Sequence, residues 1–296
     1  MDKIGIVILN YKTYKDTIRL VKDLLSFSIS DDFIIVVVDN DSPNESYSVL
    51  DDSLSQYENV KVIKSTENGG YAKGNNIGLK FLAKYNPEYA LILNNDVYFT
   101  ENVLIECVNT YKKLGDKVGI ISPLQLKPDN SIAYVGTLRC NSFLDDILSF
   151  SITYKKFSKK LEYKSNVKGD LMKVDIIPGC FVFIKFSLFE EVDFYDEDTF
   201  LFCEERFLYK KMQIVGKANY ILMDCGYIHD HSHTINSEVA YLRQKKYYND
   251  GQIAYTHKYR SLPYLKSILL KVAYQFFSCE IKVIAFLKKI KNGLQK

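Results

Sequence analysis

The stretch YALILNNDV, residues 89–97, decides the fold that is expected for this chain. An apolar run, Ala90 to Leu93, ends in two amides and a carboxylate, Asn94, Asn95 and Asp96. A strand without a polar side is typical of a parallel sheet that helices cover on both faces. Such sheets bind ligands at the carboxyl ends of their strands. The stretch therefore predicts an α/β fold with a polar ligand site at one sheet edge.

The segments before this stretch repeat the pattern. Apolar strands are expected at IGIVILN (4–10), FIIVVVDN (33–40) and NVKVIKS (59–65), and amphipathic helices at 14–27 and 74–85. Alternating strands and helices indicate a parallel sheet whose carboxyl ends share one edge. The polar residues at these ends should therefore form a single crevice. They are Asn10, Tyr11, Asp39, Asn40, Asp41, the segment ENGGYAKGNN (67–76), Asn94, Asn95 and Asp96.

Each of these motifs has a simpler interpretation when it is taken alone. Asp39 to Pro43 would make a turn and a helix start, and residues 67–76 a loop with a helix cap. Gly69 to Asn75 has the glycine spacing of a P-loop but lacks its Lys and Ser/Thr, and GxGxxG is absent. These absences disfavour an ATPase and an NAD-dependent dehydrogenase. The arrangement on successive strand ends favours a binding site over a set of turns.

The second half of the chain departs from this alternation. A Lys-, Ser- and Phe-rich region, 139–173, has poor periodicity and is interpreted as a loop or a small insertion over the sheet. The other expected elements are a helix at 101–115, a strand at 118–126, a strand, Pro-Gly turn, strand and short helix within 174–192, a helix from Glu204 to near Gly216, and a strand from 218 with three histidines at its end.

Composition limits the possible classes of protein. A chain of 296 residues with 47% apolar residues is expected to form one main domain with an appendage. Six scattered cysteines without a CxxC pair suggest buried thiols in a reducing cytosol. The N-terminus begins directly with a strand, so no signal peptide is expected. No apolar run reaches the roughly 20 residues that cross a bilayer.

Seven motifs follow one another along the chain: VILNYKT, VVVDNDS, ENGGYAKGNNIGL, LILNNDV, IPGCFVFIK, TFLFCEERFLYKKMQIVG and IHDHSHT. In this order they resemble family 2 glycosyltransferases with the GT-A fold, especially the bacterial rhamnosyltransferase-like branch. The resemblance covers residues 4 to 234 and implies a Rossmann-like, mostly parallel sheet flanked by helices. It implies a catalytic domain over 1–262, with a nucleotide-binding half to about 123 and an acceptor-side half from about 124.

The resemblance implies roles for the strand ends. The last carboxylate of the family's DxD motif binds the divalent cation, so Asp96 is expected to bind Mg²⁺ or Mn²⁺. His229 matches the histidine near the metal and diphosphate, whereas His231 and His233 equally suit surface or core histidines. Asp39 matches the residue that hydrogen-bonds the pyrimidine base. The other residues implied to border the nucleotide are Asn10, Tyr11, Gly70, Lys73, Asn75 and Asn95.

The general base is expected at the acidic pair Glu204-Glu205. Family members of this type invert the anomeric centre, and the carboxylate of an ED motif deprotonates the acceptor hydroxyl. The matching position is Glu205, but the Glu for Asp replacement leaves Glu204 open as well. Without the resemblance, two acids at a helix start are explained by the helix dipole. Donor selectivity is expected at 177–183 and acceptor selectivity in the 139–173 insertion.

The implied function is transfer of a sugar from a UDP- or dTDP-sugar to a glycan or undecaprenyl-linked acceptor in bacterial surface polysaccharide synthesis. A sugar nucleotidyltransferase is the first alternative, but LNYKTYKD (9–16) lacks its glycine-rich basic loop. A non-catalytic nucleotide- or glycan-binding module is the second. It would tolerate loss of the acidic pair, which this chain retains.

The C-terminal segment, 263–296, is expected to be a basic amphipathic helical extension. Residues 264–296 carry seven lysines and one acid, so their charge is +6 and the rest of the chain carries about −3. An acidic body argues against nucleic-acid binding. The helix suits the inner face of the cell membrane, in the cytoplasm, or packing on the body or a second subunit. Its apolar stripe is Ile268, Leu269, Val272, Phe276, Cys279, Val283, Phe286, Leu287 and Ile290.

Overall fold

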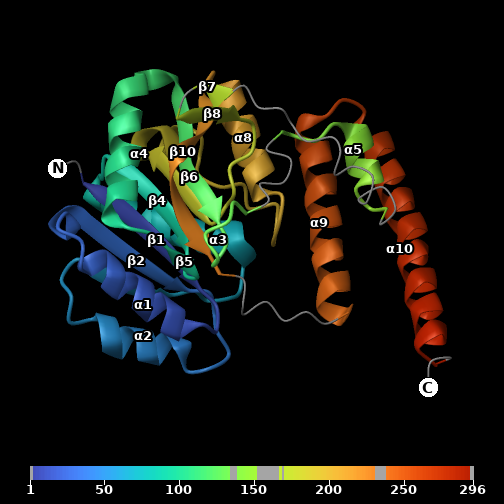
Figure 1. The fold of residues 1–296 in the computed structure, drawn as a ribbon, viewed down its shortest axis with the longest axis horizontal. Helices are drawn as coiled ribbons and strands as arrows, with labels where there is room; N and C mark the ends of the chain where they lie inside the picture. The colour runs from blue at the N-terminus through green and yellow to red at the C-terminus, as the bar shows by residue number, and fades with distance from the viewer. Residues whose placement is uncertain (1–2, 134–138, 152–166, 169, 231–237, 294–296) are drawn as a thin grey trace.

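The computed structural model describes residues 3–133, 139–151, 167–168, 170–230 and 238–293. A 10-stranded sheet in the order β3-β2-β1-β4-β9-β6-β10-β8-β7, with β5 paired to β10, forms the centre (Figure 1). The first four strands are β1 (Ile4–Asn10), β2 (Phe33–Asp39), β3 (Val60–Lys64) and β4 (Tyr89–Asn94). These four strands run parallel to one another. The predicted parallel half, with its strand ends at one edge, is therefore confirmed.

The other half of the sheet is mixed. β9 (Phe181–Lys185) lies antiparallel between β4 and β6 (Val118–Leu126). β10 (Ala218–His229) is parallel to β6 and antiparallel to β5 (Val97–Tyr98) and β8 (Leu171–Val174), and β7 (Val167–Lys168) pairs with β8. Because β9 is reversed, the Pro178-Gly179 turn before it lies at the same edge as the carboxyl end of β4.

Helices cover both faces because alternate strand residues point to opposite sides. Ile6 and Ile8 contribute to one core and Val7 to the other. Helices α1 (Tyr14–Leu25), α2 (Ser46–Leu54) and α4 (Glu101–Leu114) pack on the first face. Helices α3 (Gly70–Leu82), α7 (Phe186–Glu191) and α8 (Glu204–Ile214) pack on the second. Short 3-10 helices lie at Ser30–Asp32, Ala83–Tyr85 and Gly115–Lys117.

A helical unit stands beside the sheet and differs from the expected extension. It consists of α5 (Phe143–Leu148), α9 (Glu238–Tyr259) and α10 (Pro263–Gly293), which lie together in Figure 1. Two helices of the unit, α5 and α9, precede residue 263, where the extension was expected to begin. The sequence pattern missed α9 because its apolar residues do not form one stripe: Tyr248 and Ile253 meet the α10 cluster, and Tyr255 meets α8.

Two further expectations concern the cysteines and membrane-spanning helices. All six cysteines are free, and Cys107, Cys180 and Cys203 are buried. The expectation of buried thiols is wrong for Cys279, which is exposed on α10, and only partly met by Cys140 and Cys225. No helix within the described ranges has the length and apolarity to cross a membrane.

A buried ion cluster joins the helical unit to α8. Asp146 of α5 is fully buried and pairs with Arg206 of α8 at 2.9 Å and with Arg260, just after α9, at 2.7 Å. Gln252 of α9 donates a further hydrogen bond to Asp146 at 3.2 Å. One carboxylate therefore connects three elements that lie far apart in the sequence.

We expect Asp146→Asn to lower the free energy of unfolding by about 3–5 kcal/mol, because it leaves two buried guanidinium groups without a charge partner. Urea unfolding followed by circular dichroism measures this change. Asp23→Asn is the matched control, since it removes a half-exposed Arg19–Asp23 pair within one helix and should cost about 0.5 kcal/mol or less. Equal losses in the two variants would contradict the structural role of the cluster.

Candidate active site

The floor of the site is a hydrogen-bond network at the ends of β1 and β2. Asn10 donates to the Asp39 carboxylate at 2.7 Å and accepts from the Thr17 hydroxyl at 2.9 Å. The Ser42 backbone N–H donates to the other Asp39 oxygen at 2.9 Å. Asn10 and Asp39 are fully buried, whereas Tyr11 beside them is exposed. The network orients the Asp39 carboxylate, which retains lone pairs for a further donor.

Hydrogen bonds from the Arg19 and Asn95 side chains hold the loop after β4. Arg19 donates to the carbonyl oxygens of Asn95 and Val97, both at 2.8 Å, and stacks on the Tyr98 ring. The Asn95 amide donates to the Thr17 hydroxyl at 2.9 Å. The Asn95 amide therefore hydrogen-bonds within the protein. The same contacts fix the conformation of the loop that carries Asp96.

Asp96 and His229 meet at the edge of the sheet. The β5–β10 pairing brings them together, and His229 Nε2 lies 3.0 Å from the Asp96 carboxylate. The other ring nitrogen, Nδ1, contacts the Gln125 amide at 3.2 Å. Burial lowers the pKa of His229, but hydrogen bonds to Asp96 and Cys180 outweigh it and raise the pKa to about 10. The two predicted metal ligands are thus neighbours, while His231 and His233 lie outside the described residues.

The glycine motif forms the start of α3 rather than a loop. The helix begins at Gly70, four residues before the expected start, and Gly70 itself adopts a left-handed φ of +82°, which glycine tolerates. A Cβ there would lie 2.0 Å from the Phe200 carbonyl oxygen. This close approach lets the Tyr71 N–H donate to Phe200 at 2.8 Å. Lys73 is half-exposed and paired with Glu67, so it must leave Glu67 to reach a phosphate.

Asn75 of the helix motif was predicted to border the nucleotide. Asn75 is fully buried, and its amide donates to the Tyr71 carbonyl at 2.9 Å. Its Oδ1 has no hydrogen-bond partner among the described residues. Tyr71, which the sequence pattern did not single out, donates from its hydroxyl to the Gly179 carbonyl at 2.5 Å. The α3 start is thereby joined to the turn before β9.

The turn at residues 178–180 connects the strand ends to the acidic pair. The Cys180 carbonyl accepts from the Asn94 N–H at 3.1 Å, and the Cys180 side chain hydrogen-bonds His229. On its other side, a Cβ added to Gly179 would lie 3.1 Å from Glu205 Oε1. The Gly179 backbone hydrogen-bonds the Glu205 carboxylate. Adjacent residues of one turn therefore touch the predicted metal pair and the predicted base.

The two glutamates begin α8, as expected, but differ in environment. Glu204 is 3% exposed and Glu205 is half-buried. Burial, and then the neighbouring Glu205 charge, raise the pKa of Glu204 to about 8. Burial also raises the pKa of Glu205, while hydrogen bonds from its own and the Gly179 backbone oppose that rise. Both acids therefore hold protons more tightly than exposed carboxylates do.

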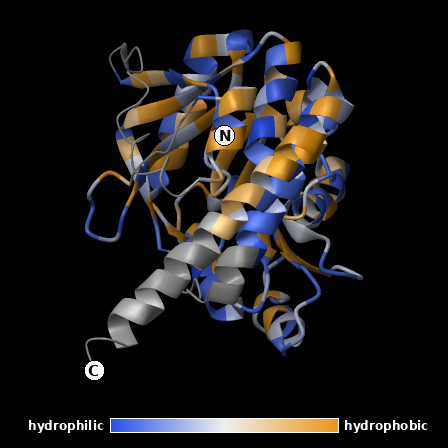
Figure 2. Cartoon of the chain, turned by 90° about the vertical axis from the view of Figure 1, so that its right-hand side faces the viewer, coloured by the Kyte–Doolittle hydropathy of each residue, from blue (hydrophilic) through white to orange (hydrophobic). Residues whose placement is uncertain are grey.

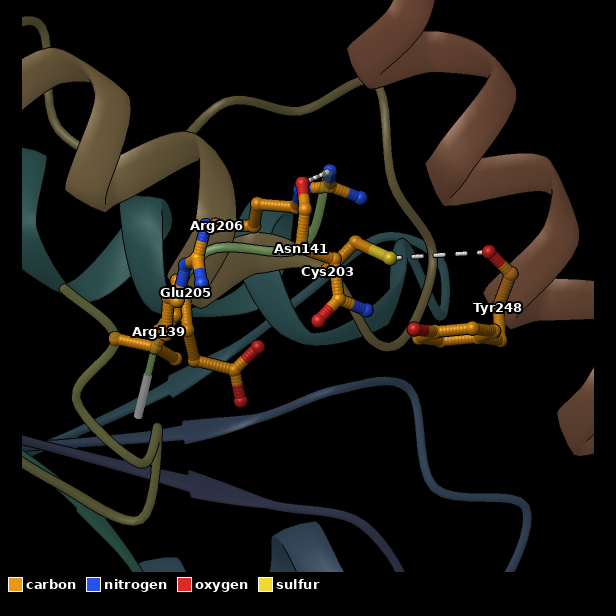
Figure 3. Close-up of a pocket in the computed structure, with 7 residues that line it drawn as sticks. Arg139, Asn141, Cys203, Glu205, Arg206 and Tyr248 are labelled. Atoms are coloured by element: carbon orange, nitrogen blue, oxygen red, sulfur yellow. Dashed lines mark hydrogen bonds between the residues drawn. The ribbon is translucent and has the colours of Figure 1, made fainter. Parts of the chain in front are cut away.

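A pocket of about 130 Å³ opens at Glu205 (Figure 3). Figure 3 shows the Glu205 side chain projecting from the start of α8, with Arg139 beside it. Glu204 does not line the pocket. The lining combines the 139–173 insertion, α8 and α9, and comprises Arg139, Asn141, Ile176, Cys203, Glu205, Arg206 and Tyr248.

The turn into α8 has an unusual backbone. Phe202 and Cys203 both adopt left-handed conformations, with φ 71° and 72°. Such conformations are unfavourable for residues with side chains and persist where the surroundings hold them. Gly251 of α9 permits close packing here, since a Cβ would lie 3.0 Å from Cys203. The sequence pattern missed this contribution together with α9.

The first part of the chain matches a known protein family. The model of the family described as glycosyl transferase family 2 matches residues 5–193. The chain belongs to glycosyl transferase family 2. The matched region contains the strand ends, the start of α3 and the turn at 178–180, whereas the acidic pair and His229 lie beyond it. The rhamnosyltransferase-like branch within this family stays a prediction.

This family 2 member is similar to other glycosyltransferases in sequence and in structure. It is 28% identical over 211 residues to the low-salt glycan biosynthesis hexosyltransferase Agl10 of Haloferax volcanii, covering 69% of this chain and 60% of that protein. A Pyrobaculum calidifontis mannosyltransferase solved with GDP-Man and Mn²⁺ superposes with a TM-score of 0.62 at 14% identity, covering 96% of this chain and 75% of that one.

Two further solved structures have the same fold. GalNAc-T7, in complex with UDP, GalNAc and Mn²⁺, gives a TM-score of 0.59 at 14% identity, covering 94% of this chain and 55% of that one. S. aureus TarS in complex with UDP superposes with a TM-score of 0.52 at 15% identity, covering 90% of this chain and 69% of that one. The fold of the family 2 chain is GT-A-like, as expected.

The raised pKa of Glu204 predicts a pH dependence of stability. The folded state keeps this proton from the ordinary pKa near 4.5 up to about 8, so the free energy of unfolding should fall as pH rises through this window. Glu204→Gln should reduce the loss between pH 5 and pH 8 by about 2–4 kcal/mol. Urea unfolding at pH 5 and at pH 8 measures this loss of unfolding free energy. Glu190→Gln, at an exposed position, is the control, and identical pH dependences in both variants would contradict the assignment.

Proposed function

We propose that this family 2 chain is an inverting glycosyltransferase that uses a UDP- or dTDP-sugar as donor. The observation that carries the proposal is the turn at 178–180. Gly179 hydrogen-bonds Glu205, and the adjacent Cys180 hydrogen-bonds His229, which contacts Asp96. In an inverting displacement, the activated acceptor and the leaving diphosphate lie on opposite sides of the anomeric carbon. The turn between Glu205 and the Asp96–His229 pair is suited to hold the sugar.

Asp96 and His229 would hold a divalent cation together with the donor diphosphate. The test of fit is chemical: a carboxylate and an imidazole converge to 3.0 Å at an edge where the Asp96 side chain is 25% exposed. No group of three His, Cys, Asp or Glu side chains within the described ranges could bind a metal alone. Phosphate oxygens would therefore complete the ligand set, which suits Mn²⁺ or Mg²⁺. The bound cation would neutralise the charge of the leaving diphosphate.

The nucleotide would bind over the strand ends. Tyr11 is exposed above the Asn10–Asp39 network, and Asp39 is held where it can accept a hydrogen bond from the imide of a pyrimidine. Lys73 would exchange Glu67 for a phosphate oxygen. Gly70, Asn75 and Asn95 shape the site through backbone and internal contacts. These roles suit a pyrimidine nucleotide, UDP or dTDP.

Glu205 would act as the general base. Its carboxylate reaches the pocket, whereas Glu204 is 3% exposed and does not line it. A pKa raised by burial makes a carboxylate a better proton acceptor near neutral pH. The acceptor hydroxyl would give its proton to Glu205 as its oxygen bonds to the anomeric carbon. The bond from that carbon to the diphosphate oxygen breaks in the same step.

The acceptor would enter through the pocket between α8, α9 and the insertion. A glycan or undecaprenyl-linked glycan remains the proposed acceptor, in surface polysaccharide synthesis. The related Agl10 is described as a glycan-biosynthesis hexosyltransferase, which supports a sugar polymer as product. Selectivity for the acceptor would rest on Arg139, Asn141 and Tyr248, which line the pocket.

We expect Asp96→Ala to weaken the apparent Mn²⁺ affinity in the presence of UDP or dTDP by at least about tenfold, because it removes the metal's carboxylate ligand. Thermal shift measures the Mn²⁺-dependent stabilisation by each nucleotide, so the readout does not require activity. Asp52→Ala, on the exposed side of α2, is the control. Unchanged Mn²⁺ dependence in Asp96→Ala would remove Asp96 from the metal site.

We expect Glu205→Gln to lower kcat by about 10²–10⁴-fold with little change in the KM for donor, since Gln keeps the shape but accepts no proton. Nucleoside diphosphate release, with a panel of nucleotide sugars and a lipid-linked acceptor, measures the loss. Glu204→Gln is the matched variant and should retain most turnover. An inactive Glu204→Gln beside an active Glu205→Gln would assign the base to Glu204. Metal-dependent nucleotide binding without release by the wild type would indicate a binding module.

A further inference from the structure

Helix α10 has an apolar face that no other described residue covers. Five large side chains, spaced i, i+3, i+4, i+7 and i+11, are between 43% and 71% exposed. We call them the outer face of α10: Leu265, Ile268, Leu269, Val272 and Phe276. Isolated exposed apolar residues are common, but a continuous row is typical of a surface that binds a partner. The row contains four members of the stripe predicted from the sequence.

The opposite side of α10 packs on the rest of the helical unit within the part of the helix whose side chains are described. Ser267, Leu270 and Ala273 are buried, and Leu270 and Ala273 form a core with Phe150. Tyr274 packs edge-on against the Phe150 ring at 5.6 Å between centroids. These contacts fix the rotation of α10 about its axis. They direct the outer face away from α9 and α5, and α10 lies outermost in Figure 1 and in front in Figure 2.

Positive charge accompanies this face. The segment 264–296 carries +6. Lys271 is exposed at the border of the outer face. An apolar face with a basic flank is complementary to a layer of acyl chains under anionic headgroups.

We propose that the outer face of α10 docks on the surface of an anionic lipid bilayer. The helix would lie in the headgroup region with its apolar row toward the acyl chains and its lysines at the phosphates. A second copy of the chain is the less favourable partner, because a twofold contact would bring two segments of charge +6 together. The docking does not depend on which sugar, if any, the chain transfers.

Docking would also bring the body that contains the pocket to the bilayer. The cluster of Asp146, Arg206 and Arg260 joins the helical unit to α8, and Arg206 is adjacent to Glu205 and lines the pocket. The unit and the candidate base are therefore parts of one packed body. This consequence rests on the proposed function, and it suits an acceptor carried on a membrane lipid.

The test is co-sedimentation of the full chain with vesicles of phosphatidylcholine alone and of phosphatidylcholine with phosphatidylglycerol, at low and high salt. We expect binding to the anionic vesicles that falls with salt. Ile268→Ser with Val272→Ser and Phe276→Ser should weaken it by at least about tenfold, because the apolar area that enters the bilayer is removed. Ile214→Ser, at an apolar side chain of α8 that is 65% exposed, is the control and should bind as the wild type does.

Three additional measurements separate the outcomes. Circular dichroism and nucleotide-dependent thermal shift should be unchanged in the triple variant, which shows that the fold and donor site are intact. Light scattering reports the oligomeric state without vesicles. Equal vesicle binding by the triple variant and the wild type would overturn the proposal, as would absence of wild-type binding. A wild-type dimer that the triple variant dissociates, without vesicle binding, would assign the face to a subunit interface.

Discussion

The antiparallel insertion of β9 between β4 and β6 is the constraint on which the candidate site depends. Since β9 runs against β4, with Phe181 opposite Leu93, its amino end lies where β1, β2 and β4 end. The turn at 178–180 is thereby placed next to Asn94, and its Cys180 carbonyl accepts a hydrogen bond from the Asn94 N–H. A parallel β9 would carry this turn to the opposite edge of the sheet. Glu205 would then lose its contact with the residues at the strand ends.

Burial of charge gives the residues at the start of α8 different properties. Asp146 and Arg206 are buried together with Arg260, so each has an opposite charge within 3 Å. Glu204 is equally buried, but its Oε1 has no hydrogen-bond partner among the described residues, and its pKa rises to about 8. Neighbouring positions of one helix therefore serve different purposes: Arg206 anchors the helical unit, while Glu205 faces the pocket.

Much of the sheet and half of the site could be predicted because the signals are local. The apolar runs before Asn10, Asp39 and Asn94 each mark one strand, and polar residues at parallel strand ends must share an edge. Helix α9 could not be predicted in this way. It packs on α10 through some residues and on α8 through others, so no single stripe marks it. Tyr71 and Gly251 were missed because their partners, Gly179 and Cys203, are distant in sequence.

The sequence by itself determined the strands and helices of the α/β body, the polar residues at the strand ends and the apolar stripe of α10. Periodicity determines these features, since they depend on residues a few positions apart. Only the tertiary structure decided that β9 is reversed, that Glu205 rather than Glu204 faces the pocket, and that the stripe of α10 points outward. Burial and exposure decide these features, and they depend on contacts between segments that the sequence order leaves far apart.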